Sequence, residues 1–171
     1  SSYKRMKEKS IVRNCSWCHN EGHNKATCKV FFADKIQAIV SNKAFRQEAL
    51  AFLKEHKIGP GTMLGIPITD YSMPEGSQAK QKLFLVKEIK WDEINYQHPR
   101  SSLICEPLGN ESYYGGDDLR LSQSFMKKIK EGKYSIVTPA MEKRIAIGIP
   151  ADWFTGMSGM AVAFPDGFAK K

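Results

Sequence analysis

The first regular pattern of apolar and polar positions begins after residue 29, where apolar residues recur at the spacing of an α-helix. This spacing predicts a short amphipathic helix over 30–40. Ser41 and Asn42 can cap a second helix that runs to about His56, and we expect the two helices to pack together. Their inner faces comprise Phe32, Ile36, Ile39 and Val40 in the first helix and Phe45, Ala49, Phe52 and Leu53 in the second.

The pattern changes at the Gly-Pro-Gly turn over 59–61, after which the apolar residues form short extended runs. These runs predict six strands, at 62–69, 82–91, 102–107, 133–138, 144–149 and 160–164. The first strand is expected at a sheet edge, because Pro67 cannot donate a ladder hydrogen bond. In the second strand, one face comprises Leu83, Leu85, Ile89 and Trp91, and the other begins with Phe84 and Val86.

One further helix is expected between the strands. Asp118 or Ser122 can cap it, and it should run through Lys130 and stop at Gly132. Short strands with a single inserted helix and no regular βα alternation predict an antiparallel barrel or a strongly curved sheet. We therefore expect an α+β protein whose β-rich part is an SH3-like or Tudor-like barrel, with an OB-like barrel as the alternative.

Positive charge is concentrated at the beginning of the chain. The 171 residues carry 26 Lys and Arg against 18 Asp and Glu, a formal net charge of +8. Residues 1–30 supply +5 of this charge, from Lys4, Arg5, Lys7, Lys9, Arg13, Lys25 and Lys29 against Glu8 and Glu21. Such asymmetry suggests a polyanionic partner, most simply nucleic acid, although a solvated basic tail is the alternative.

Three of the four cysteines fall within CSWCHNEGHNKATC at 15–28. The spacing C-x2-C-x4-H-x4-C offers three sulfurs and one imidazole, the ligand set of tetrahedral Zn2+ in a closed structural site. The predicted ligands are Cys15, Cys18, His23 and Cys28. His19 adjoins Cys18 and would distort the chelate ring, so His23 is the preferred histidine. This spacing favours a metal site over disulfides and hence a reducing compartment, whereas Cys105 is expected to be a small buried hydrophobe.

The same segment resembles the CCHC zinc knuckle of retroviral nucleocapsids, transposase tails and certain plant transcription factors. Gly22 stands where the family places glycine before the ligating histidine, and His19 stands where the family often has another glycine. The resemblance implies one structural Zn2+ and a preference for single-stranded RNA or DNA, although some zinc knuckles bind proteins. The expected organisation is a basic arm and zinc knuckle over 1–29, a helical connector over 30–58 and a β-rich domain over 59–171.

The contacts with nucleic acid are expected around this knuckle. Trp17 has no evident core to enter, so its ring can meet an unstacked base, with packing against Phe31 or Phe32 as the alternative. Basic side chains are expected to contact phosphates, namely Arg13, Lys25 and Lys29 beside the knuckle and Lys4, Arg5, Lys7 and Lys9 in the arm. A solvated run of charge is the alternative for the arm.

No catalytic constellation is evident. The sequence contains no P-loop, G-x-S-x-G or zinc-deaminase pattern, and its His-Asn pairs resemble metal-dependent HNH nucleases only superficially. We expect a non-enzymatic nucleic-acid-binding protein, with an adaptor for RNA polymerase or the ribosome as the alternative and a metal-dependent nuclease third. No apolar run suggests a membrane span or a secretory signal, so the expected location is cytoplasmic or nucleoid-associated, or nuclear in a eukaryote.

Overall fold

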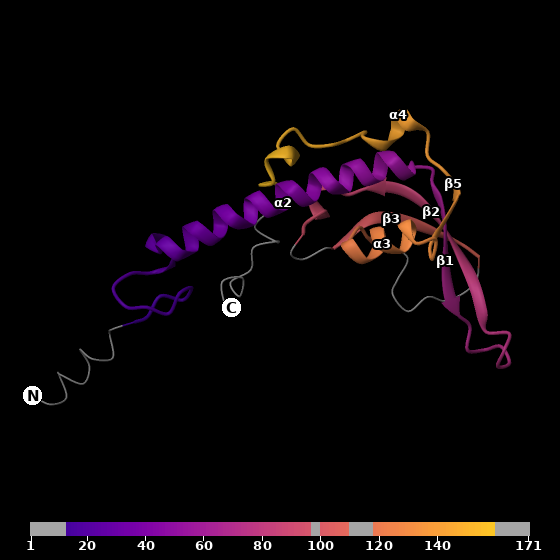
Figure 1. The fold of residues 1–171 in the computed structure, drawn as a ribbon, viewed down its shortest axis with the longest axis horizontal. Coiled ribbons are helices and arrows are strands. Elements are labelled where there is room, and N and C mark those ends of the chain that lie inside the picture. The colour runs from indigo at the N-terminus through magenta and orange to yellow at the C-terminus, as the bar shows by residue number, and fades with distance from the viewer. Residues whose placement is uncertain (1–12, 97–99, 110–117, 160–171) are drawn as a thin grey trace, which may run out of the picture.

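The computed structural model describes residues 13–96, 100–109 and 118–159 (Figure 1). Its elements, in chain order, are η1 (Lys25–Thr27), α2 (Lys29–His56), β1 (Met63–Thr69), β2 (Ala79–Ile89), η2 (Trp91–Glu93), β3 (Ser101–Leu108), β4 (Leu119–Arg120), α3 (Gln123–Lys130), β5 (Ser135–Thr138), α4 (Glu142–Ile145) and η3 (Trp153–Thr155). Helices and an antiparallel sheet together confirm the expected α+β class. Among the helices of these ranges, none combines the length and apolarity needed to cross a membrane.

The helical region is one continuous helix, α2, so the expectation of two helices packed together is wrong. This helix has 28 residues and is about 42 Å long at 1.5 Å per residue. Asn42 does not cap a second helix, because its side chain is held by other segments. Its amide nitrogen donates to Asn95 Oδ1 and to the Gly156 carbonyl oxygen, at 3.2 and 2.9 Å. Its amide oxygen accepts from the Tyr96 backbone N–H at 3.1 Å.

The sheet has five strands in the order β4-β3-β2-β1-β5, and every neighbouring pair is antiparallel. Within the described residues β4 and β5 are the outer strands, so the sheet is open there, and the barrel type stays a prediction. The expectation that the strand with Pro67 lies at a sheet edge is wrong, because β1 lies between β2 and β5, although β5 pairs with it only from Met63 to Gly65. Pro67 lies beyond that pairing and faces only Gln81 of β2, so its missing N–H breaks no ladder bond to β5.

Of the two faces of β2, the one that begins with Phe84 and Val86 is buried over most of the strand. Phe84 and Val86 are 0% and 1% exposed, whereas Leu83 and Leu85 are only half-buried. The register between β2 and β3 shifts between Val86 and Glu88. Because such a bulge changes which face a side chain occupies, Ile89 reaches the core although Leu83 and Leu85 do not.

The later elements follow the sequence only in part. Ser122 caps α3 as expected, since its hydroxyl accepts from the Phe125 backbone N–H at 3.2 Å, and the helix ends before Gly132. The expected strand over 144–149 is wrong, because this segment begins within α4 and continues as a turn. Its Ile147 carbonyl accepts from the indole N–H of Trp91 at 3.1 Å instead of from a ladder partner. The expected strand 160–164 lies outside the described residues.

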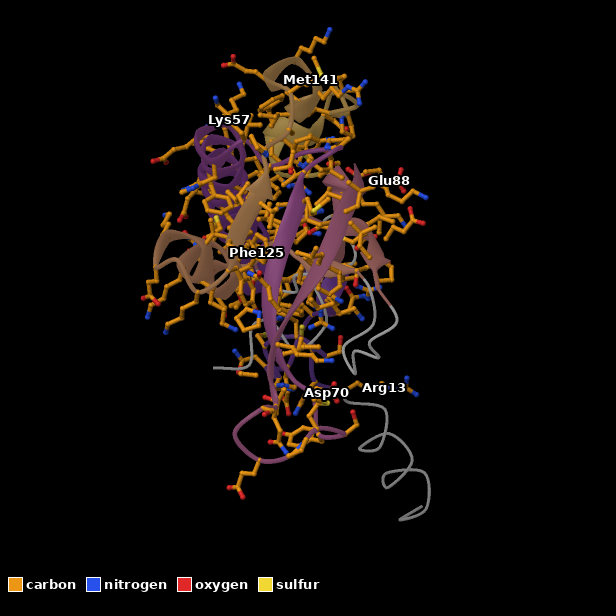
Figure 2. All side chains as sticks on the ribbon, turned by 90° about the vertical axis from the view of Figure 1, so that its right-hand side faces the viewer. Arg13, Lys57, Asp70, Glu88, Phe125 and Met141 are labelled. Atoms are coloured by element: carbon orange, nitrogen blue, oxygen red, sulfur yellow. The ribbon has the colours of Figure 1, made fainter. Side chains whose placement is uncertain are left out.

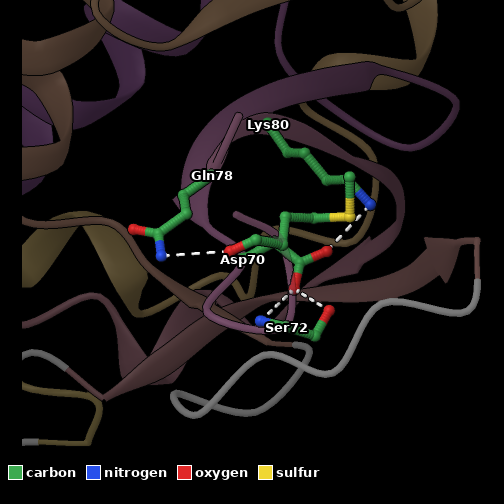
Figure 3. Close-up of polar contacts among 5 residues, drawn as sticks. Asp70, Ser72, Gln78 and Lys80 are labelled. Carbon is green, nitrogen blue, oxygen red and sulfur yellow. Dashed lines mark hydrogen bonds and ion pairs between the residues drawn. The ribbon is translucent and has the colours of Figure 1, made fainter. Parts of the chain in front are cut away.

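The β1–β2 hairpin ends in a polar turn at the opposite end of the sheet from Lys57 and Met141 (Figure 2). Asp70 accepts hydrogen bonds from the backbone N–H and hydroxyl of Ser72, and it forms an ion pair with Lys80 at 2.9 Å (Figure 3). These bonds from Ser72 and Lys80 lower the pKa of the Asp70 carboxyl to about 2. The contribution of Asp70 to stability is therefore fully present above its unfolded pKa, near 4, and is lost as the pH falls toward 2.

A buried arginine, Arg46, joins α2 to the segments 94–95 and 153–158. Arg46 is 1% exposed, and its guanidinium has five N–H groups to satisfy. All five donate to acceptors outside α2, namely Ile94 O, Trp153 O, Asn95 Oδ1 and both the hydroxyl and the carbonyl oxygen of Ser158. Burial lowers the pKa of Arg46 below its ordinary value, while the charges of Asp92 and Asp152 oppose this shift.

Replacement of Arg46 should therefore destabilise the whole fold. We expect Arg46→Met to lower the free energy of unfolding by about 3 kcal/mol, because it leaves several buried acceptors without donors. Urea denaturation followed by circular dichroism measures this change. Lys43→Met, at an exposed position on the same helix, is the matched control, and an equal, small effect of both variants would contradict the assignment.

Candidate metal centre

Four side chains converge in front of α2. The ligand atoms of Cys15, Cys18, His23 and Cys28 all lie within 4.8 Å of one another, and we call this group the Cys3His cluster. In a tetrahedral site with metal–sulfur bonds of about 2.3 Å, neighbouring ligand atoms are about 3.8 Å apart. Cys18 Sγ lies 3.2 Å from His23 Nε2, close to that spacing. The cluster can therefore hold a four-coordinate metal ion.

The loop that carries the cluster needs two residues with positive φ. Gly22 has φ +95° and His19 has φ +67°, which is the left-handed region where glycine is least strained. The turn is closed by hydrogen bonds from the Cys15 N–H to Asn20 O at 2.8 Å and from the His19 N–H to Cys15 O at 2.9 Å. His19 is exposed and lies outside the Cys3His cluster, in keeping with the preference for His23 as the histidine ligand.

Backbone N–H groups point at the sulfur atoms. Cys15 Sγ accepts from the Trp17 N–H at 3.4 Å, and Cys28 Sγ accepts from the Phe31 N–H at 3.3 Å. Burial opposes ionisation of Cys15, but N–H groups of Cys18 and Trp17 and hydrogen bonds with the other thiols lower its pKa to about 7. The pKa of Cys18 is raised, because burial and the neighbouring thiols outweigh the N–H of Asn20. These N–H groups stabilise thiolate, the form that binds metal.

Cys28 also begins the long helix. It is the N-cap of α2, with extended backbone angles, and its sulfur takes the place of the oxygen that a Ser or Asp cap would supply. A negative charge at this position interacts favourably with the helix dipole. A metal bound to Cys28 would therefore be fixed relative to the axis of α2.

Trp17 is buried against α2, which corrects the expectation that its ring is open to a base. It is 1% exposed, its indole N–H donates to Asp34 Oδ2 at 3.0 Å, and its ring meets Phe31 edge-on at 5.1 Å between centroids. Ala38 completes this small second core at 0% exposure. Packing against Phe31, the alternative reading of Trp17, is therefore the one observed. The indole attaches the Cys3His cluster to the helix.

The expected phosphate contacts are only partly described. Arg13 is exposed and points away from the chain (Figure 2), and Lys29 is exposed at the start of α2. Lys25 is half-buried, with its ammonium 5.2 Å from the Trp17 ring centroid and 5.1 Å from that of Phe31. The basic arm residues Lys4, Arg5, Lys7 and Lys9 lie outside the described residues.

Sequence reasoning missed the helix face that receives the cluster. The expected apolar stripe is largely exposed, with Phe32, Ile36 and Val40 at 48%, 64% and 56%. The contacting face is instead Phe31, Asp34 and Ala38, which also follow helical spacing but include a charged residue. Cys105 is 7% exposed and separate from the cluster, as expected for a small buried hydrophobe.

The fold and the cluster define an α+β protein whose three cysteines and one histidine at the start of a long helix could hold a metal ion. No family model matches the chain, and no match is found among curated proteins or solved structures. The chemistry of the cluster is therefore the guide to its function.

Metal analysis tests the cluster directly. We expect the purified protein to carry one equivalent of metal. Loss of a residue that only hydrogen-bonds to a metal ligand typically lowers metal affinity about 10–100-fold, and we expect Cys28→Ser, which removes a ligand, to lower it further. Elemental analysis after dialysis against a weak chelator measures the loss. Cys105→Ser is the matched control, and a variant at Cys105 that loses metal as readily as Cys28→Ser would refute the assignment.

Proposed function

We propose that this protein is a zinc-knuckle nucleic-acid-binding protein that contacts single-stranded RNA or DNA. Three thiolates and one imidazole suit Zn2+ by their softness and number. The residues that would hold it are Cys15, Cys18, His23 and Cys28. With four protein ligands the ion keeps no open position for water or substrate, so its contribution is structural.

The observation that carries this proposal is the placement of basic side chains around a cluster fixed to α2. Arg13 precedes the first cysteine, Lys25 covers the Trp17 ring, and Lys29 follows Cys28 at the helix start. Lys25 and Lys29 lie in η1 and α2 on either side of Cys28, so the fold fixes their backbone beside the cluster, and Arg13 lies two residues before Cys15. Their charges are therefore placed to contact phosphates. The charge of +5 within residues 1–30 supports the same partner.

An aromatic side chain other than Trp17 is open to a base. Phe32 is 48% exposed, and its ring meets that of Phe31 at 5.8 Å between centroids. Phe31 in turn contacts Trp17, so Phe32 stands beside the docked cluster. Stacking of an unpaired base on an aromatic ring contributes about 1–3 kcal/mol. We assign this stacking contact to Phe32, while Trp17 positions the cluster.

Salt dependence separates phosphate contacts from stacking. Affinity for a fluorescent single-stranded oligonucleotide, measured by anisotropy across a salt series, should fall linearly with log salt. Arg13→Gln and Lys29→Gln should each reduce that slope by about 0.7, whereas Lys54→Gln, at an exposed position near the other end of α2, should not. Phe32→Ala should weaken binding about tenfold with the slope unchanged. A flat salt dependence would remove the proposed interface.

A second function, that of an adaptor to RNA polymerase or the ribosome, is favoured by the exposed stripe of Phe32, Ile36 and Val40. Side chains at this i, i+4, i+8 spacing are the anchors by which an amphipathic helix binds a protein groove. Ile36→Glu distinguishes the two functions. If the protein is an adaptor, this variant loses co-sedimentation with the purified machine but keeps its affinity for single strands.

A further inference from the structure

A second basic site lies where three strands end together. β2 ends just before Lys90, β3 begins just after Arg100, and Arg120 of β4 pairs with Ser101 of β3. The Lys90 N–H donates to the Ser102 carbonyl at 2.8 Å, which holds these ends in register. The ends border an open cavity of about 420 Å3, within the ~300–1,000 Å3 range of small-molecule sites. Its lining residues are Lys90, Glu93, Arg100, Ser101 and Arg120.

The charges around this cavity are unbalanced. Three cations, Lys90, Arg100 and Arg120, share it with the single carboxylate of Glu93. Within the described part of the chain, the ion pairs involve other residues, so these three cations face the cavity without a bound carboxylate. Positive charges gathered at a concave surface attract an anion. Guanidinium groups form paired hydrogen bonds with phosphate oxygens, so two arginines indicate a phosphate in particular.

Glu93 adds a second requirement on the ligand. Its Oε2 atom is buried and has no hydrogen-bond partner among the described residues. A buried carboxylate oxygen without a donor is unfavourable, so a rotation of the Glu93 side chain that brings this oxygen to an O–H or N–H of a ligand in the cavity would add to affinity. An anion such as sulfate, which carries no donor at neutral pH, does not meet this requirement. The ligand must carry both a phosphate and a hydrogen-bond donor.

We propose that this cavity binds a nucleotide unit. Arg100, Arg120 and Lys90 hold its phosphate, and Glu93 accepts a hydrogen bond from a ribose hydroxyl or a base amino group. The site stands on its own observations, because none of its residues belongs to the Cys3His cluster. A free nucleotide and the 5′-phosphorylated end of a strand both carry a phosphate and these hydrogen-bond donors. Titration with each of them separately distinguishes the two ligands.

Calorimetric titration of the full chain tests the site with four probes: GMP, inorganic phosphate, and a short oligonucleotide with or without a 5′-phosphate. We expect GMP to bind at least tenfold more tightly than inorganic phosphate if the free nucleotide is the ligand. If a strand end is the ligand, the 5′-phosphate should strengthen oligonucleotide binding at least tenfold. In either case the double variant Arg100→Gln/Arg120→Gln should lose that preference.

The control is Lys54→Gln/Lys143→Gln, which removes the same charge from exposed positions and should leave both preferences intact. Cys28→Ser should also leave them intact, which separates this site from the proposed function of the cluster. The proposal is overturned if neither preference exists, or if the arginine variant and the lysine control behave alike while both retain the circular dichroism spectrum of the parent.

Glu93→Ala reports on the hydrogen bond. If Glu93 accepts from the ligand, this variant weakens binding of the preferred nucleotide probe at least threefold and does not weaken binding of sulfate, an anion without a hydrogen-bond donor. If Glu93 merely repels the anion, both probes bind more tightly, and the assignment of a nucleotide rather than a simple anion is wrong.

Discussion

Cys28 belongs both to the Cys3His cluster and to the long helix, and these two roles organise residues 15–28. Its sulfur lies among the ligand atoms of the Cys3His cluster and also accepts the Phe31 N–H as the N-cap of α2. Trp17 adds a second attachment through Asp34 and Phe31. The small segment 15–28 lacks an apolar core of its own, so it packs against one face of α2. A metal ion held by the cluster would therefore be linked to helix initiation through one side chain.

The other half of α2 is fixed by a different kind of contact. Phe45, Ala49, Phe52 and Leu53 enter the main core, while Arg46 and Asn42 bind loop carbonyls and Asn95. Gly156 completes this junction, because a Cβ atom there would lie 2.7 Å from the Ile39 carbonyl oxygen. The helix is thus a continuous connection between the Cys3His cluster and the sheet. Under the proposed function, it sets how nucleic acid at the cluster is presented to the rest of the protein.

The sequence predicts those features that short-range chemistry determines. The ligand spacing, the Ser122 cap, the inner face of the second half of α2 and most strands follow from local patterns. The misses arise where distant residues decide the outcome. Asn42 is a good cap in isolation, but Asn95 and Gly156 hold its side chain within a continuous helix. Trp17 has no visible core in its own segment, because Phe31 and Ala38 supply it from α2. The register shift after Val86 changes which face of β2 is buried, and the local sequence does not predict such a bulge.

The central claim is that a metal ion in the Cys3His cluster orders the basic beginning of the chain on α2. Hydrogen exchange of the backbone amides, compared between the zinc-loaded and chelator-treated protein, tests it most directly. The account predicts that chelation removes protection over 15–28 and the first turns of α2 and leaves the amides of 45–53 protected by the main core. Unchanged protection over 15–28 after complete removal of the metal would contradict it.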